Sequence, residues 1–115
     1  MSQRIPKINK DEQKILNSYF TKLKTKIKLD KVLLFGSKAY GIPDKNSDLD
    51  LIVISTDFDG MSFFKRLDLL SLLRKNVAED VAMDVIGYTP KEFSRLEKES
   101  AIAKKAKTKG IWLKK

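Results

Sequence analysis

The chain has 115 residues and a formal net charge of +9, with 42% hydrophobic and 34% charged residues. This length and balance predict a single folded domain over residues 1–115, large enough for a core of its own. Cysteine and histidine are absent, which excludes disulfides, thiolate or imidazole metal ligands, and histidine acid–base chemistry. A metal or proton-transfer site in this chain must therefore use carboxylates, lysines, tyrosines or hydroxyl groups.

The positive charge is concentrated at the two ends of the chain. Residues 1–31 and 91–115 each hold nine lysines or arginines against three acids, whereas residues 32–90 hold six against nine. This pattern suits a cation site with a separate surface for an anionic partner, although solvated helix faces also explain the lysines. Nucleic acid is not indicated beyond these basic flanks, because no known binding module accompanies them. With no membrane-spanning apolar run and no secretory signal at the start, we expect a cytoplasmic protein.

The first part of the chain predicts a helix followed by a strand. Asn9 and Glu12 have the spacing of a capping box, and apolar residues then recur every three or four positions. We expect these in the core: Ile15, Leu16, Tyr19, Phe20, Leu23 and Ile27. The short apolar run from Val32 to Phe35 predicts a strand that is buried on both faces.

The second part of the chain continues the alternation of strands and helices. Leu49 to Ile54 predicts another buried strand, and Val81 to Ile86 predicts a third. Between them, Ser62 caps a helix that we expect to end near Lys75. Its buried side should contain Phe63, Phe64, Leu67, Leu70 and Leu73.

The last helix has a well-defined beginning. Thr89, Pro90 and Glu92 form a capping box with proline in the first turn, and we expect the helix to run to about Lys107. Gly110 then ends it, and the apolar residues 111–113 should pack on the sheet. The order of elements predicts an α/β domain, two-layered in the α+β sense, with a small mixed sheet of three or more strands and about four helices.

Candidate metal ligands open the second strand. Asp48 and Asp50 are two positions apart, so their side chains point to the same face, about 6.7 Å apart at the backbone. Mg²⁺ prefers one or two carboxylates together with water and substrate phosphate. Asp84 interrupts the third strand, and it joins this face if the two strands are neighbours; otherwise it is an aspartate on an edge strand facing water. Three carboxylates packed together need cations to offset their repulsion.

A candidate phosphate site precedes these acids. Gly36 and Ser37 follow a buried strand, where a glycine lets the backbone approach a ligand and the next N–H groups can point at phosphate oxygens. An ordinary turn at the end of a strand is the alternative. The second Asp-x-Asp pair, Asp57 and Asp59, lies in a loop, and we interpret it as turn and capping chemistry rather than a metal site.

Together these residues resemble the nucleotidyltransferase superfamily that includes DNA polymerase β, aminoglycoside nucleotidyltransferases and the minimal nucleotidyltransferases. The family pattern is an apolar residue, Gly, Gly or Ser, about ten residues, Asp-x-Asp or Asp-x-Glu, and a third acid on a later strand. In this chain the pattern reads Phe35-Gly36-Ser37, ten residues, Asp48-Leu49-Asp50 and then Asp84. The short length and the ending Gly110-Ile111-Trp112-Leu113 are similar to the minimal group.

The resemblance implies a nucleotidyltransferase fold and a Mg²⁺-dependent transfer of AMP from ATP to a hydroxyl group, with two metal ions. Asp48, Asp50 and Asp84 would be the catalytic and metal-binding residues, and Gly36, Ser37 and Lys38 would hold the nucleotide phosphates. Many minimal members are antitoxins of HEPN-family toxins, so the implied partner is such a toxin and the implied activity is protein adenylylation.

Two other functions remain open at this point. One is small-molecule nucleotidylation of the aminoglycoside type, and the other is a non-catalytic module that blocks a toxin by contact alone. The sequence also departs from the Gly-Ser-Arg-x-Arg-Gly of many minimal members, because Lys38 and Tyr40 replace the two arginines. Lys38 keeps a charge without the bidentate guanidinium, and Tyr40 carries none.

Overall fold

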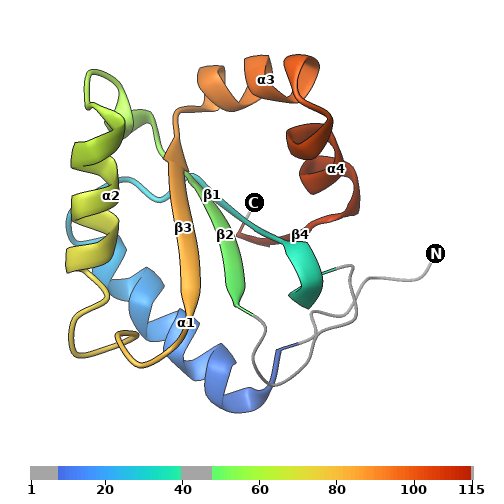
Figure 1. Cartoon of the computed structure of the whole chain (residues 1–115). Helices are drawn as coiled ribbons and strands as arrows, with labels where there is room; N and C mark the ends of the chain where they lie inside the picture. Colours follow the sequence, from blue (N-terminus) through green and yellow to red (C-terminus); the bar gives the residue numbers. More distant parts are fainter. Residues whose placement is uncertain (1–7, 40–47, 115) are drawn as a thin grey trace.

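The computed structural model describes residues 8–39 and 48–114 (Figure 1). In chain order the elements are α1 (Lys10–Leu23), β1 (Lys31–Phe35), the 3₁₀ turn η1 (Gly36–Lys38), β2 (Leu49–Ile54), the 3₁₀ turn η2 (Thr56–Phe58), α2 (Phe63–Leu72), β3 (Met83–Tyr88), α3 (Pro90–Glu99), α4 (Ala101–Lys109) and β4 (Ile111–Lys114). The strands form one sheet in the order β3-β2-β1-β4. The β2 strand is antiparallel to β1 and parallel to β3, and β4 is antiparallel to β1. The predicted fold class, a small mixed sheet with about four helices, is confirmed.

Helices α1 and α2 cover one face of the sheet (Figure 1). Asn9 forms the predicted capping box at the start of α1, since its Oδ1 accepts from the Glu12 N–H at 2.8 Å. The fully buried Tyr19 donates its hydroxyl hydrogen to the Leu70 carbonyl oxygen at 2.6 Å, which joins α1 to α2. Odd-numbered residues of β2, including Leu49, Leu51 and Val53, face this core.

Helices α3 and α4 cover part of the opposite face. Ile52 and Ile54 of β2 pack there with Phe93 of α3 and Ala106 of α4. Trp112 of β4 meets the Phe93 ring edge-on, with the ring centroids 6.2 Å apart. The even-numbered residues of β2 therefore begin at a half-buried Asp50 and continue into a second apolar core.

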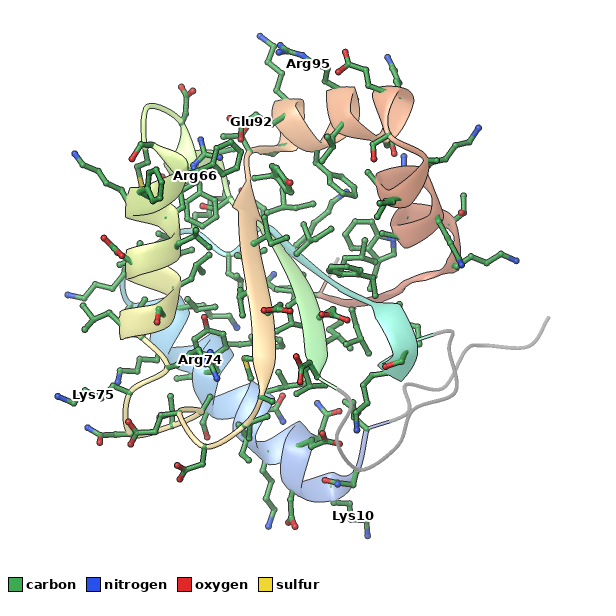
Figure 2. All side chains as sticks on the ribbon, in the orientation of Figure 1. Lys10, Arg66, Arg74, Lys75, Glu92 and Arg95 are labelled. Atoms are coloured by element: carbon green, nitrogen blue, oxygen red, sulfur yellow. The ribbon has the colours of Figure 1, made fainter. Side chains whose placement is uncertain are left out.

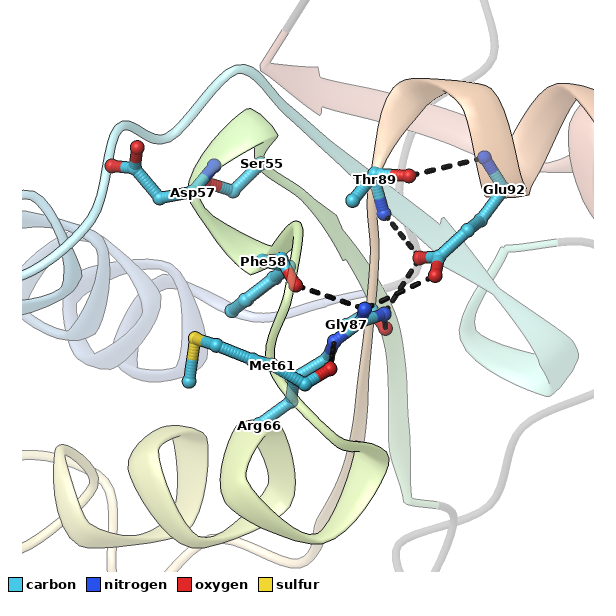
Figure 3. A network of polar contacts seen from close by, with 8 residues as sticks. All are labelled: Ser55, Asp57, Phe58, Met61, Arg66, Gly87, Thr89 and Glu92. Atoms are coloured by element: carbon cyan, nitrogen blue, oxygen red, sulfur yellow. Dashed lines mark hydrogen bonds and ion pairs between the residues drawn. The ribbon is translucent and has the colours of Figure 1, made fainter.

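One buried side chain, Arg66 of α2, connects elements on both faces of the sheet (Figure 3). Arg66 is 3% exposed, and each of its guanidinium nitrogens donates a hydrogen bond. Nη1 and Nη2 bind the two carboxylate oxygens of Glu92 at 2.6 and 3.0 Å. The guanidinium also binds the carbonyl oxygens of Phe58, Met61 and Gly87. Together with the capping bonds from Thr89, this pairing lowers the pKa of Glu92 to about 2, with the Arg66 hydrogen bond as the largest cause.

Three predictions about the helices are wrong. Helix α2 ends at Leu72 rather than near Lys75, because the chain continues in turns. Its buried side contains Arg66 and Leu70, and Leu73 is buried just past its end, whereas Phe63, Phe64 and Leu67 are 51%, 80% and 45% exposed. The predicted final helix is two helices: Ser100 ends α3 and its hydroxyl caps α4 by accepting from the Ala103 N–H at 3.3 Å.

Several boundaries follow the predictions closely. The β2 strand has the predicted limits, Thr89 and Glu92 form the predicted capping box, and Gly110 ends α4. The third strand starts and ends two residues later than predicted, at Met83–Tyr88. Residues 111–113 do pack on the sheet, as part of the edge strand β4. In the described ranges 8–39 and 48–114, no helix is long and apolar enough to cross a lipid bilayer.

Replacing Arg66 should destabilise the fold strongly. In Arg66→Met, three carbonyl oxygens and the Glu92 carboxylate lose their donor, and we expect the free energy of unfolding to fall by about 3 kcal/mol. Urea unfolding followed by circular dichroism measures the change. The matched control is Arg95→Met on the exposed surface of α3 (Figure 2), where a change below about 0.5 kcal/mol is expected. Equal losses in both variants would contradict the role of Arg66.

Candidate active site

The parallel pairing of β2 and β3 brings two of the predicted acids face to face. Asp50 lies directly opposite Asp84 in the register. Asp48 immediately precedes β2, and its place two residues before Asp50 puts it on the same face by strand alternation. Asp48 and Asp84 are exposed and Asp50 is half-buried, so the three acids lie at an open end of the sheet face. Both interpretations of Asp84 therefore hold in part: it is an exposed aspartate on an edge strand, and it also lies on the same face as Asp48 and Asp50.

The electrostatics of Asp50 reflect this crowding. Burial is the largest cause of a raised pKa at Asp50, and the nearby carboxylates of Asp84 and Asp48 raise it further. A carboxylate whose pKa is raised by neighbouring anions is stabilised when a cation binds between them. All the available donors are carboxylate oxygens, which are the ligands that Mg²⁺ and similar hard cations prefer. The donor set therefore fits a magnesium site.

The side chains are not drawn together into a single metal-binding cluster. In the part of the chain that the structure describes, no three acidic side chains lie close enough to hold one ion. Asp50 lies between the other two acids, and the negative charges of Asp84 and Asp48 both raise its pKa. Asp50 is therefore the residue that a bound cation would relieve most.

Gly36 is shaped by its contact with Asp50. It follows Phe35, which is the register partner of Asp50 on β1, and it has φ +74°, a conformation that favours glycine. A Cβ at this position would overlap Asp50 Oδ2 and lie 3.1 Å from Asp50 Cγ. The glycine therefore allows the turn η1 to lie directly against the carboxylate.

The remaining phosphate-site candidates, Ser37 and Lys38, follow in η1. The Ala39 N–H donates to the Gly36 carbonyl oxygen at 3.0 Å, which closes the turn, and Ser37 is half-buried within it. Lys38 is 8% exposed and its Nζ lies 3.3 Å from Glu12 Oε2, in the first turn of α1. The predicted phosphate ligand Lys38 is thus paired with a carboxylate in this structure. Tyr40, the other departure from the family pattern, lies outside the described residues.

Glu12 is a site neighbour that the sequence pattern did not reveal. Its Oε1 accepts from the Asn9 N–H at 3.0 Å as the capping box requires, while Oε2 pairs with Lys38. The capping role was recognisable in the sequence. The second role depends on the packing of α1 beside η1, for which the sequence carries no signal.

The second Asp-x-Asp pair has the structural role predicted for it. Asp57 Oδ2 accepts from the Lys28 N–H at 2.8 Å, and Ser55 caps the turn η2 by accepting from the Asp57 N–H at 3.1 Å. Asp59 ends the same turn and is exposed. Asp57 thus holds η2 against the segment before β1, and Asp59 marks the end of that turn.

Replacing Gly36 by alanine should lower the free energy of unfolding by more than the strain of placing an alanine at positive φ. We expect Gly36→Ala to lose about 1–2 kcal/mol of unfolding free energy beyond the loss in Gly60→Ala. Gly60 is the matched control because it has φ +81° and a Cβ added there would meet no atom within 4 Å. Urea unfolding measures both losses. In an Asp50→Ala background the excess should disappear, and an unchanged excess would show that Asp50 is not the obstacle.

Replacing Asp50 should stabilise the protein in the absence of a metal. The raised folded-state pKa means that ionised Asp50 costs stability at neutral pH, and this cost disappears as pH falls from the folded pKa to below the ordinary value of 3.8. Asp50→Asn should therefore raise the unfolding free energy at pH 7, and the gain should shrink toward pH 3.5. Urea titrations at both pH values measure it, with exposed Asp59→Asn as control. A loss of stability at pH 7 would contradict the predicted crowding.

Comparison with known proteins identifies the fold and the family. The family described as nucleotidyltransferase domain matches residues 16–113. The crystal structure of an inferred nucleotidyltransferase from Sulfolobus solfataricus is similar with a TM-score of 0.56 and 17% identity, over 92% of this chain and 87% of that one. BolA1 from Arabidopsis thaliana has a TM-score of 0.51 and 20% identity, over 74% of this chain and 98% of that one, which is a likeness of fold alone. No curated protein sequence matches. The predicted resemblance is confirmed, and the chain belongs to the nucleotidyltransferase domain family.

Proposed function

We propose that this nucleotidyltransferase transfers AMP from ATP to a hydroxyl group of a protein, with Mg²⁺ as cofactor. The observation that carries the proposal is the position of Asp50, which lies opposite Asp84, beside Asp48 and against the Gly36 turn. A row of carboxylates next to a glycine turn suits a metal-bound triphosphate, because the turn can approach the phosphates and the acids can bind cations.

The chemistry is a displacement at the α-phosphorus of ATP. The acceptor oxygen forms a bond to phosphorus, the bond to the pyrophosphate oxygen breaks, and pyrophosphate leaves. Two bound Mg²⁺ ions would supply charge neutralisation for the attacking and leaving oxygens. Asp48, Asp50 and Asp84 would hold these ions. Asp84, which is exposed on the edge strand, would either help to hold the metal or accept the proton from the hydroxyl group.

The turn η1 would bind the remaining phosphates. Gly36 leaves room for a close approach, and the Ser37 hydroxyl and backbone N–H groups are donors. Lys38 would contribute a positive charge if its ammonium exchanged Glu12 for a phosphate oxygen. The 3.3 Å ion pair is nearly buried on both sides, so this exchange would link nucleotide binding to the first turn of α1.

The biological role we propose is that of an antitoxin that adenylylates a HEPN-type toxin. A contact-only antitoxin is the second candidate, and the exposed apolar residues of α2 favour it, since Phe64 and Leu72 are 80% and 65% exposed. A small-molecule acceptor has no comparable observation in its favour.

Nucleotide binding and nucleotide transfer can be tested one after the other. ATP with Mg²⁺ should raise the melting temperature, and ATP labelled at the α-phosphate should label a HEPN-type partner protein, whereas γ-labelled ATP should not. Asp48→Asn with Asp50→Asn should reduce labelling at least about a hundredfold without unfolding the chain. The control with the same charge change is Asp59→Asn with Asp80→Asn, both on the exposed surface.

The outcomes separate the two candidates. Unchanged labelling in the Asp48 and Asp50 double variant would exclude the proposed site. Full neutralisation of the partner by that variant, in the absence of label transfer, would instead support the contact-only antitoxin.

A further inference from the structure

The β3 strand lies at the end of the sheet, and one of its backbone edges is free of other strands. Its only strand neighbour in the described part of the chain is β2. The carbonyl oxygens of Ala82 and Tyr88 accept from the N–H groups of Leu49 and Ser55, so the even-numbered peptide groups face β2. By alternation, the N–H and carbonyl groups of residues 83, 85 and 87 point away from the sheet.

Two arginines occupy this outer edge on both sides of Val85. Arg66 Nη1 donates to the Gly87 carbonyl oxygen at 3.2 Å, and Arg74 Nη1 donates to the Met83 carbonyl oxygen at 3.4 Å. Figure 2 shows the two arginines between α2 and β3, toward opposite ends of the strand. Val85 lies between them, and within residues 8–39 and 48–114 its outward peptide groups have no partner. Of the outward-facing residues 83, 85 and 87, Val85 alone therefore has both its N–H and its carbonyl oxygen open for pairing within the described ranges.

A groove of about 350 Å³ runs along this open position, between α2 and β3. Leu67 and Ser71 of α2 line it on one side, and Asp84 and Val85 line it on the other. Asp68 and Arg74 also line the groove. Asp68 is exposed and has no ion pair among the described residues, whereas the Arg74 guanidinium is bonded to backbone carbonyl oxygens. The groove thus combines an unpaired peptide unit, an apolar wall and a free carboxylate, which is the composition of a site for an extended peptide.

The position of the groove relative to the candidate active site is fixed by the sheet. Asp50 on β2 and Asp84 on β3 are register partners, and both point to the same face. A strand added at Val85 would lie about 4.8 Å beyond β3. Its residue opposite Asp84 would extend the row from Asp50 through Asp84, so a side-chain hydroxyl there would lie beside the proposed proton acceptor.

The charges of the groove argue against two other occupants. A second copy of this chain, paired symmetrically at Val85, would bring both copies of Asp68 and of Asp84 together, which is unfavourable for like charges. A nucleic acid would place phosphates against the same carboxylates. An extended segment with a lysine or arginine near its hydroxyl residue complements Asp68.

We propose that the acceptor is an extended polypeptide segment that pairs with Val85 at the edge of β3, with a basic residue at Asp68 and its hydroxyl beside Asp84. This inference rests on the proposed function, since it specifies the acceptor of the same site. The affinity comes from backbone hydrogen bonds, and the selectivity comes from Asp68 and from the width of the gap between Arg66 and Arg74.

The test uses variants that alter the edge without altering the sheet. Val85→Pro removes the outward N–H and leaves the hydrogen bonds to β2 in place, as an edge strand tolerates, although it also changes a side chain that packs against the core. Val85→Thr is the control that changes the same side chain but keeps the N–H. The probe is a set of fluorescein-labelled nonapeptides with a central Tyr, Ser or Thr, flanked either by lysines or by glutamates. Fluorescence anisotropy measures docking, and α-labelled ATP measures transfer. Melting curves with and without ATP and Mg²⁺ report folding and nucleotide binding separately.

We expect the lysine-flanked peptides to bind and to be labelled at least about tenfold better than the glutamate-flanked ones. Val85→Pro should weaken docking about tenfold while ATP still raises the melting temperature, and Val85→Thr should behave as the wild type. Asp68→Lys, on the exposed surface, should reverse the charge preference, and it keeps the test decisive if the proline variant does not fold.

Other outcomes would overturn the inference. One is equal docking of both peptide classes or of both Val85 variants, and another is a wild type that binds ATP but neither docks nor labels any peptide. A concentration-dependent dimer in light scattering, lost in Val85→Pro, would assign the edge to a second copy instead. Failure of ATP to raise the wild-type melting temperature would count against the proposed function itself, whatever the anisotropy shows.

Discussion

The pairing of the buried Arg66 with the partly exposed Glu92 is the interaction on which the arrangement of this domain depends. Arg66 belongs to the helix on one face of the sheet, and Glu92 belongs to the first turn of the helix on the other face. Burying a guanidinium costs several kcal/mol unless every donor is satisfied, and here each nitrogen has an acceptor. The rings of Phe58 and Phe63 lie 5.6 and 4.9 Å from the guanidinium carbon and add cation–π attraction. Since the pair also binds the Gly87 carbonyl oxygen, it holds the end of β3 in place, and with it the register that puts Asp84 opposite Asp50.

The features that could be predicted from the sequence are the ones encoded locally. The capping boxes at Asn9 and Thr89 and the limits of β2 depend on residues within a few positions of one another, and the structure has them as predicted. The alternation of Asp48, Leu49 and Asp50 likewise fixes which side chains share a face. Local chemistry therefore accounts for the core of the candidate site.

The features that could not be predicted depend on partners far along the chain. An arginine within a leucine-rich helix is ordinarily expected to be solvated, yet Arg66 is buried because Glu92 and three carbonyl oxygens from other segments converge on it. Its burial rotates α2, so Phe64 and Leu67 face solvent although their spacing predicts a core position. The Lys38–Glu12 pair and the parallel register of β2 with β3 are of the same kind. Each is decided by packing rather than by pattern.

Arg66 of α2 and Arg74 in the turns after it stabilise the fold, and they also shape the outer edge that β3 presents to other chains. A free strand edge invites uncontrolled pairing with other chains, and proteins usually protect such edges with charged side chains. Arg66 and Arg74 do so here by binding the outward carbonyl oxygens at Gly87 and Met83, and the first of them is the same residue that joins the two faces of the sheet. The protection is incomplete at Val85, the residue next to Asp84. Because the unbound outward carbonyl oxygen of Val85 lies beside the carboxylate row, an edge protected for stability would also restrict where an extended partner can reach the site.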